Sequence, residues 1–509
     1  MGGIFQTVVS VTAFSCAERF LGFLYRIFLS RSLGSEGLGL YQISLSVLGL
    51  FMTVTSSGIP ITVSRIMIKY KSEGKENKIS SVVTAGVLTA IALCVPLVLL
   101  VLSKSGLLNI LFSDERCLTV LGVMIPGLIF TSVYAVIRGT FWGNKQFMPY
   151  SVIEFLEEAV MLIAGIILVN TAVDLQDGVV KAGYAVLISY LFSFTVSMAV
   201  FFIKGGRLKS PKGELRPLLR SATPITAMKT STSLINTLIA VLLPARLVYY
   251  GISSSTAVSQ FGKVFGMAFP LIFMPSTIIG SLALVLVPEL SSNYYSKRFT
   301  TLKNNVEKAI KFACVIACLI IPVFLSMGRE IGEFIYKDET AGSYVVKGAL
   351  TMLPMSLAMI STSMLNSLNK EKQTLLSYFC GASVMLVCIY FLPSVIGIDA
   401  LTVGMFCNFL ITAIINVVLL YKTCPIKIKV LKPIILALLS VIPSALFGIF
   451  LKGILKNLLS VWLLTIICST LIFLFARAFI AAFGLLDFVF EKKSNIKVFK
   501  VRHSFNNGN

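Results

Sequence analysis

The sequence predicts an all-α polytopic membrane protein with about fourteen transmembrane helices, organised as two six-helix lobes followed by a C-terminal helix pair. Three observations lead to this prediction. The 509 residues are 56% hydrophobic and 13% charged, whereas soluble domains are about 45–50% apolar and about 25% charged. Apolar stretches of roughly 18 or more residues, long enough to cross a hydrocarbon core, recur along the chain. Basic residues gather between these stretches, and together the observations exclude a soluble enzyme.

The expected spans follow when each apolar run is bounded at charged residues or at clusters of Gly and Pro. Two runs are less regular than the others. The seventh is diluted by Ser and Thr, and the eighth is long and contains Pro270 and Pro275. The fourteen spans are 5–29, 39–64, 79–102, 118–141, 151–170, 180–203, 221–244, 259–288, 309–327, 343–366, 374–393, 400–421, 431–450 and 457–484.

The distribution of basic residues predicts the orientation. Lys and Arg number 44 against 22 Asp and Glu, a balance that in a soluble chain would suggest a nucleic-acid partner. Here the bases lie in loops, and loops rich in Lys and Arg face the cytoplasm. With the N-terminus inside, and with bases near the span ends counted with the adjoining loop, 30 of the 44 fall on cytoplasmic segments and 10 on outer segments, and four lie deeper inside spans. We predict a bacterial cytoplasmic (inner) membrane protein with both termini in the cytoplasm and no nucleic-acid partner.

The residue types exclude several kinds of chemistry. The single histidine, His503, lies in a polar tail, so a His-based metal site or catalytic triad cannot form. The ten cysteines lie mostly inside apolar runs and lack zinc-type spacing, and no G-x-x-x-x-G-K-[ST] phosphate loop occurs. The first apolar run carries charges and no cleavage pattern, which predicts a retained helix. We expect no metal and no cofactor beyond a coupling ion or the membrane potential.

A short repeat supports the two-lobe organisation. Asn144-Lys145 follows the fourth span, and Asn369-Lys370 follows the tenth, 225 residues later in the same kind of turn. Transporters are often built from two bundles related by an axis along the membrane normal, although Asn-Lys is a common turn pair and coincidence is the alternative. The predicted regions are an N-terminal lobe at 1–220, a C-terminal lobe at 221–430, an accessory helix pair at 431–490 and a basic cytoplasmic tail at 491–509.

The first span carries charge at membrane depth. Ser15, Arg19, Gly22 and Arg26 recur at steps of four, three and four residues, which places them on one helical face. A charge in the hydrocarbon core costs about 2.5 kcal/mol or more, so it normally faces a wet cavity or a partner. The two guanidinium groups would form a fork for phosphate oxygens. The alternative is that Arg19 pairs with a carboxylate and Arg26 extends to the interface.

The two spans that open the second half carry lysines. Lys229 in the seventh span and Lys263 in the eighth are expected to face the same cavity as the arginines, which would suit an anion. Pro270 and Pro275 remove backbone donors and are expected to form a hinge, because broken helices commonly frame transporter sites. Hydroxyl residues on the seventh span are expected to line the cavity, with helix-to-helix packing as the alternative. These residues are Thr226, Thr230, Ser233 and Thr237.

Three glutamates lie at the cytoplasmic end of the fifth span. One interpretation is an interfacial acidic cluster that faces Arg138 and Lys145. The other is a site for a coupling cation or a proton. Glu18 precedes Arg19 in the first span and is expected to offset its charge. The three glutamates are Glu154, Glu157 and Glu158.

The opening of the chain resembles a known family. It reads Arg19-Phe-Leu-Gly22-Phe-Leu-Tyr-Arg26 and then Arg31-Ser-Leu-Gly34-Ser-Glu-Gly37-Leu-Gly39-Leu-Tyr41-Gln42. This pattern resembles the polysaccharide-exporter branch of the MOP (multidrug/oligosaccharidyl-lipid/polysaccharide) flippase superfamily, whose members are related to lipid II flippases. The resemblance implies two six-helix lobes around a cationic cavity, with Arg19 in that cavity, and a final helix pair that guides a lipid tail.

The residues and the resemblance together predict a transporter and not an enzyme. It would flip an undecaprenyl-pyrophosphate-linked saccharide, a lipid II-like peptidoglycan precursor for the spore cortex, by alternating access. Arg19, Arg26, Lys229 and Lys263 would hold the pyrophosphate. The expected partners are this lipid-linked oligosaccharide, the lipid bilayer and cell-wall synthesis enzymes, with the protein a monomer. The alternatives are a cation-coupled multidrug or metabolite antiporter, which would need acids in its cavity, and a membrane glycosyltransferase or polymerase, which would need acids in an outer loop.

Overall fold

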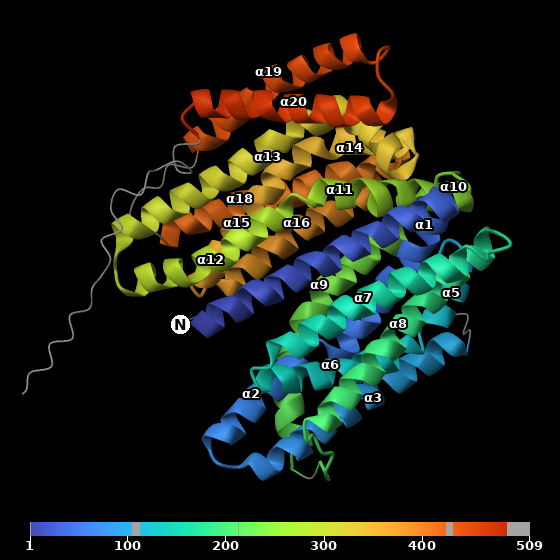
Figure 1. Ribbon diagram of the computed structural model, residues 1–509, viewed down its shortest axis with the longest axis vertical. Helices are drawn as coiled ribbons and strands as arrows, with labels where there is room; N and C mark the ends of the chain where they lie inside the picture. Colours follow the sequence, from blue (N-terminus) through green and yellow to red (C-terminus); the bar gives the residue numbers. More distant parts are fainter. Residues whose placement is uncertain (1, 104–111, 212, 424–430, 486–509) are drawn as a thin grey trace, which may run out of the picture. The chain divides into compact units, whose positions relative to one another are not determined.

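The computed structural model describes residues 2–103, 112–211, 213–423 and 431–485, and this part of the chain is helical and contains no β-strand (Figure 1). Eleven helices in it are long and apolar enough to cross a membrane, or twelve if the bent pair Arg116–Met124 and Gly127–Gly143 is one span. The predicted all-α membrane fold is confirmed. A total of fourteen is compatible with this count, because the candidate Ser10–Ser72 covers two predicted spans and the helix Phe147–Val169, which corresponds to the predicted span 151–170, is not among the candidates.

The first two predicted spans lie within α1 (Gly2–Ser56), which consists of two helices joined at Gly34. Gly34 has a φ of 65°, in the left-handed region that glycine adopts without a steric penalty. A second break at Ser57-Gly58 separates α1 from α2 (Ile59–Ser72). Pro60 lies in the first turn of α2, where its missing N–H leaves no helical hydrogen bond unmade. The short η1 (Glu76–Lys78) then leads into α3 (Ile79–Leu102).

The next four helices complete the first half of the chain. α5 (Arg116–Met124) and α6 (Gly127–Gly143) meet at a bend of 44°, and Pro126 at this bend is the N-cap residue of α6. α7 (Phe147–Val169) and α8 (Leu175–Ile203) pack side by side. Asp174 caps α8, because its side chain accepts a hydrogen bond from the Asp177 N–H at 2.7 Å.

The second half departs from the prediction at its eighth span. The run predicted as one helix over 259–288 is divided, and Met274 and Pro275 form the break between α11 and α12. Within the run, the backbone of η2 is a π-helix, a local widening that often accompanies functional sites. The elements of the second half are α9 (Leu215–Tyr249), α10 (Ser254–Phe261), η2 (Gly262–Ala268), α11 (Phe269–Phe273), α12 (Ser276–Tyr295), α13 (Phe299–Tyr336), α14 (Glu339–Gly348), η3 (Ala349–Thr351), α15 (Met352–Ser367), α16 (Glu371–Phe391), α17 (Pro393–Ile396), α18 (Asp399–Thr423), α19 (Leu431–Leu455) and α20 (Val461–Ala482).

The chain forms two compact units. The first comprises Met1–Met274, Gly328–Met355 and Lys372–Ile414, and the second comprises Pro275–Met327, Ser356–Glu371 and Ile415–Asn509. The first unit therefore includes parts of the second half of the sequence, and the predicted division at 220 and 430 stays a prediction. One core of this unit lies among α2, α3, α6 and α8, where Val63, Val82, Ile137 and Phe201 are among the buried side chains.

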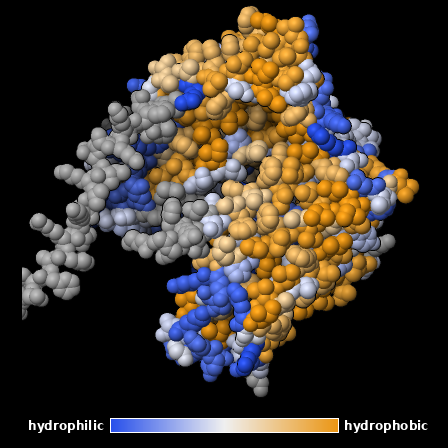
Figure 2. All heavy atoms as spheres, in the orientation of Figure 1, coloured by the Kyte–Doolittle hydropathy of each residue, from blue (hydrophilic) through white to orange (hydrophobic). Residues whose placement is uncertain are grey.

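In the second unit, α19 and α20 lie side by side (Figure 1). The rings of Phe447 and Phe475 stack at a centroid distance of 4.2 Å, while Ile442 and Leu446 on α19 are each 61% exposed. Figure 2 shows that hydrophobic residues cover most of the face in view. Large exposed apolar surfaces are unusual for a soluble protein, and here they are consistent with helices that contact lipid.

Candidate substrate cavity

A cavity of about 490 Å³ lies among α1, α2, α6 and α9 of the first unit. Its volume is in the range of ligand sites, about 300–1,000 Å³. Two of the thirteen lining residues, all in the described part of the chain, are basic and none is acidic. The lining residues are Gly49, Met52, Thr53, Ser56, Ser57, Pro60, Ile61, Arg138, Trp142, Lys229, Thr232, Ser233 and Asn236.

The break between α1 and α2 allows α9 to approach closely. A Cβ added to Gly58 would lie 2.5 Å from the Ala222 carbonyl oxygen and would also meet the Thr226 hydroxyl. Only a residue without a side chain fits at this contact. The break also exposes the Ser57 carbonyl oxygen, which Lys229 Nζ approaches at 3.5 Å.

The hydroxyl stripe predicted on the seventh span packs largely against α1 and α2. Thr237 donates a hydrogen bond to the Ser46 carbonyl at 2.9 Å, and Thr53 donates to Ser233 at 3.3 Å. Thr226 lies at Gly58, and the buried Thr230 hydroxyl has no hydrogen-bond partner among the described residues. Of the four, Ser233 alone lines the cavity, so helix-to-helix packing, the alternative interpretation, accounts for the contacts of Thr226 and Thr237.

The cavity face of α9 lies beside that stripe. Lys229, Thr232, Ser233 and Asn236 line the cavity and recur at i, i+3, i+4 and i+7, the spacing of one helical face. Sequence reasoning missed Thr232 and Asn236. A signal was present, because both lie on the helical face that Lys229 defines.

Arg138 on α6 is the second base of the cavity, and sequence reasoning had counted it with a cytoplasmic loop. Its Nη1 donates to Glu154 Oε1 at 2.7 Å. Its guanidinium lies 5.3 Å from the Trp142 ring centroid and 5.8 Å from that of Tyr134, within the range of cation–π attraction. The Arg138 Nε is buried and has no hydrogen-bond partner among the described residues. This guanidinium thus touches both the cavity and Glu154 of α7.

The predicted acidic cluster is present around Arg138. Glu154 forms the ion pair with it, Glu18 lies within electrostatic range of both, and Glu157 interacts with Glu154 and Glu158. The pair of Glu154 and Arg138 is a contact that the first interpretation expects, and both that interpretation and a coupling role stay predictions. No group of three or more His, Cys, Asp or Glu side chains with metal-binding geometry occurs within the described ranges.

The structure places the two predicted arginines of α1 outside the lining of this cavity. Arg19 is exposed and interacts with the neighbouring Glu18. Arg26 is half-buried and lies within electrostatic range of Glu158, while Ser15 is half-buried and lines neither described cavity. A role of these residues toward a substrate stays a prediction.

The second predicted lysine has an acidic partner. Lys263 on η2 forms an ion pair with Asp338 at 3.3 Å, between Nζ and Oδ2. Pro270 lies in the first turn of α11, and Pro275 is the N-cap residue of α12, so the helix breaks where the hinge was predicted. The hinge and the substrate contact of Lys263 stay predictions.

A second ion-pair network joins α1, α5 and α10. Arg116 Nη2 lies 2.6 Å from Glu36 Oε1 and 2.7 Å from Asp114 Oδ2, and Ser254 donates to Asp114 at 3.2 Å. Burial raises the pKa of the Asp114 carboxyl. The hydrogen bonds and the charge of Arg116 lower it by more than burial raises it, so the pKa lies below its usual value. This network lines neither described cavity.

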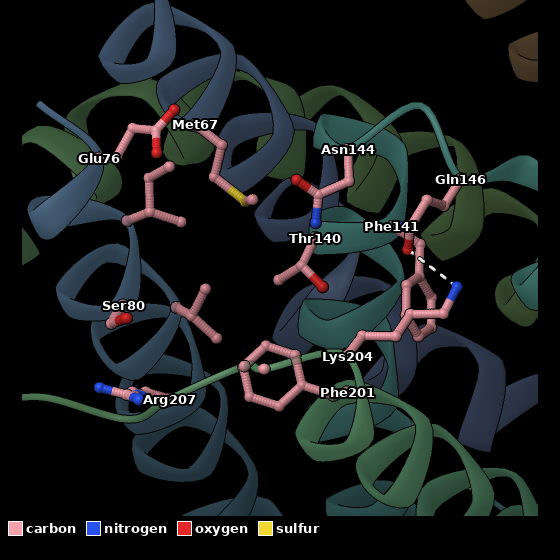
Figure 3. A pocket seen from close by; sticks show the side chains of 14 residues that line it. Met67, Glu76, Ser80, Thr140, Phe141, Asn144, Gln146, Phe201, Lys204 and Arg207 are labelled. Carbon is pink, nitrogen blue, oxygen red and sulfur yellow. Dashed lines mark hydrogen bonds between the residues drawn. The ribbon is translucent and has the colours of Figure 1, made fainter. Parts of the chain in front are cut away.

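A smaller cavity of about 190 Å³ lies between α2, α3, α6 and the segment after α8 (Figure 3). Its charged lining residues are Glu76, Lys204 and Arg207. Lys204 Nζ donates to Gln146 Oε1 at 3.1 Å and lies 5.9 Å from the Phe141 ring centroid. The charges here are mixed in sign, and at least one base already has partners.

The chain is similar to known proteins in both sequence and structure. A family model described as polysaccharide biosynthesis protein matches residues 4–294. Stage V sporulation protein B of Bacillus subtilis is 22% identical over 443 residues, which are 83% of this chain and 84% of that protein. The lipid II flippase MurJ of Bacillus subtilis is 22% identical over 408 residues, 73% of this chain and 74% of that one. A solved structure of lipid II flippase MurJ in an inward closed conformation has a TM-score of 0.68 at 16% identity and covers 92% of this chain and 99% of its own.

Proposed function

The chain belongs to the polysaccharide biosynthesis protein family, as its resemblance to the polysaccharide-exporter branch of the MOP superfamily implied, and we propose that it is a flippase for a polyprenyl-pyrophosphate-linked saccharide. The substrate is an undecaprenyl-linked precursor of the lipid II type, carried across the cytoplasmic membrane by alternating access. Arg138 and Lys229 hold its pyrophosphate.

The composition of the larger cavity carries this proposal. Two bases without an acid among the lining residues make a site that favours an anion. Guanidinium binds phosphate oxygens bidentately, and lysine contributes a point charge. The hydroxyls of Thr53, Ser56 and Ser57 and the amide of Asn236 can exchange hydrogen bonds with sugar hydroxyls. The lining of the cavity thereby provides polar contacts for the headgroup, which cannot enter the hydrocarbon core unaided.

The relatives support the same class of substrate. One is named as a lipid II flippase, and another as a sporulation protein, which favours peptidoglycan of the spore cortex as the destination. In this proposal the lipid tail stays in the bilayer and is guided by α19 and α20. Both termini lie in the cytoplasm in this proposal. Arg19, Arg26 and Lys263 contact the headgroup in other conformations of the transport cycle, after the headgroup has left Arg138 and Lys229.

The test uses the full-length protein in liposomes that contain fluorescent lipid II. A membrane-impermeant reductant quenches the outer leaflet, and the rate at which protected dye becomes accessible measures transfer. Lys229→Glu is expected to slow transfer at least about tenfold, since a hydrogen bond to a charged group contributes about 1.5–3 kcal/mol and the reversal adds repulsion. Arg220→Glu is the matched control, because Arg220 is exposed on the same helix and lines neither cavity.

Three results would contradict the proposal in different ways. Equal transfer in protein-free and protein-containing liposomes would overturn the flippase assignment. Wild-type rates in Lys229→Glu would overturn the role of the cavity. Transport of a lipophilic cationic dye in place of lipid II would favour a cation-coupled antiporter.

A further inference from the structure

Arg138 belongs to two sites at once. It lines the cavity, and its Nη1 donates to Glu154 Oε1 at 2.7 Å. The side chains of this pair are 30% and 21% exposed, so water screens them only partly. Phosphate oxygens that enter the cavity therefore compete with Glu154 for the same guanidinium.

Glu154 has poor alternatives if it loses this partner. The four carboxylates of the cluster outnumber the three guanidinium groups around them, and Arg19 and Arg26 interact with Glu18 and Glu158. A partly buried carboxylate without a cation is costly in its charged form, and the group then tends to neutralise. The groups facing the cluster are Glu18, Arg19, Tyr25, Arg26 and Tyr41 on α1, Tyr134 and Arg138 on α6, Glu157 and Glu158 on α7, Tyr190 on α8 and, toward Arg138, Lys229 on α9.

A buried hydroxyl without a hydrogen-bond partner lies near the acidic cluster. Tyr134 is 3% exposed, and its hydroxyl has no hydrogen-bond partner among the described residues. It lies within electrostatic range of Glu154, Glu157 and Glu18. A carboxylic acid donates one O–H, and a tyrosine hydroxyl can accept it. The surroundings of the cluster thus contain a hydroxyl whose hydrogen-bonding capacity is unused.

We propose that substrate loading is linked to proton uptake: the pyrophosphate displaces Glu154 from Arg138, and Glu154 then binds one proton from water. The inference rests on the proposed function, because it requires an anion in the cavity. The only bond formed is the O–H of the Glu154 carboxyl, and the proton comes from the solvent. Arg138 keeps its charge throughout and exchanges one anionic partner for another.

Calorimetry on the detergent-solubilised full-length protein tests this exchange, with farnesyl pyrophosphate as the probe. Titrations in two buffers of different ionisation enthalpy give the number of protons taken up on binding. Wild type is expected to take up about one proton more than Glu154→Gln, in which the competing charge is absent. At the highest pH of the titrations, Glu154→Gln is expected to bind the probe about tenfold more tightly than wild type. Because wild type must take up a proton on binding, this difference in affinity shrinks by up to tenfold for each unit by which the pH is lowered.

Glu36→Gln is the matched control, because Glu36 forms the same kind of pair with Arg116 at 2.6 Å but lines neither cavity. It is expected to show the wild-type affinity and proton number. Probe binding with equal proton numbers in wild type and Glu154→Gln would overturn this inference and leave the flippase proposal intact. No binding of the probe by wild type would overturn the cationic site on which both rest. If Glu154→Gln fails to fold, the affinity of wild type for the probe is measured as a function of pH. An affinity that changes with pH only as the titration of the probe itself requires would overturn the inference without any variant.

Discussion

The two cavities of the first unit differ in how their charges are partnered. In the larger one, Lys229 faces a backbone carbonyl at 3.5 Å, and no carboxylate is among the lining residues. In the smaller one, Glu76 lies in the same lining as Lys204 and Arg207 (Figure 3). A cavity with unbalanced charge attracts a ligand of the opposite sign, whereas mixed charges compensate one another. Lys229 therefore indicates an anion site directly, because no carboxylate in the cavity lining compensates its charge, whereas Arg138 is paired with Glu154 and would have to exchange that partner for an anion.

The largest expected effect comes from Arg138, which connects the larger cavity with the acidic cluster. Arg138→Leu is expected to lower the stability of the purified protein by on the order of 2 kcal/mol, because Glu154 loses its ion-pair partner, and to slow lipid II transfer at least about tenfold. Adding Glu154→Gln removes the unpaired charge. The double variant is therefore expected to regain thermal stability, measured as an apparent melting temperature, but not transfer. Recovery of transfer in the double variant would mean that Arg138 acts only through Glu154.

An intermediate effect is expected at the helix break that shapes the larger cavity. Gly58→Ala places a methyl group against the Ala222 carbonyl, and overpacking of this kind costs about 1–3 kcal/mol. We expect a lower melting temperature and a several-fold slower transfer as α9 shifts. Gly49→Ala is the control, because Gly49 lines the same cavity and an added Cβ there meets nothing within 4 Å. Equal losses in both variants would show that the cavity tolerates no added volume, and the close approach of α9 would not be the cause.

The smallest effect is expected in the smaller cavity. Lys204→Gln removes an exposed base whose contacts are Gln146 and the Phe141 ring, and exposed polar contacts contribute about 1 kcal/mol or less. Lipid II transfer is expected to stay within about twofold of wild type in the liposome assay. A loss as large as that of Lys229→Glu would place the smaller cavity on the substrate path and remove the distinction between the two.

Much of the fold could be predicted from the sequence, because apolar runs of bilayer length leave few alternatives to helices. Each predicted span overlaps one or more described helices. Local backbone breaks were harder to predict. Gly34 lies between the first two predicted spans, as expected of a turn, but the break at Gly58 lies inside the second predicted span, where a glycine before Ile-Pro gave only a weak signal.

The candidate site could be predicted less well than the fold, because a one-dimensional pattern shows which residues share a helical face but not which face meets which cavity. Lys229 lines the larger cavity, and its role toward a substrate stays a prediction, whereas Arg138 was assigned to a loop because the fourth span was ended near it. Its ion pair with Glu154 connects two helices, and the possible contact was considered only as an interfacial cluster. The positions of Arg19, Arg26 and Lys263 depend on tertiary contacts that hydropathy does not encode.

The carbonyl partner of Lys229 has a further consequence for the electrostatics of the larger cavity. A dipole orients an ammonium group without neutralising it, so the positive charge of Lys229 stays uncompensated at this contact. The side chain is exposed, and dissolved salt therefore screens its field. Any anion that this cavity binds is expected to bind more weakly as the ionic strength rises.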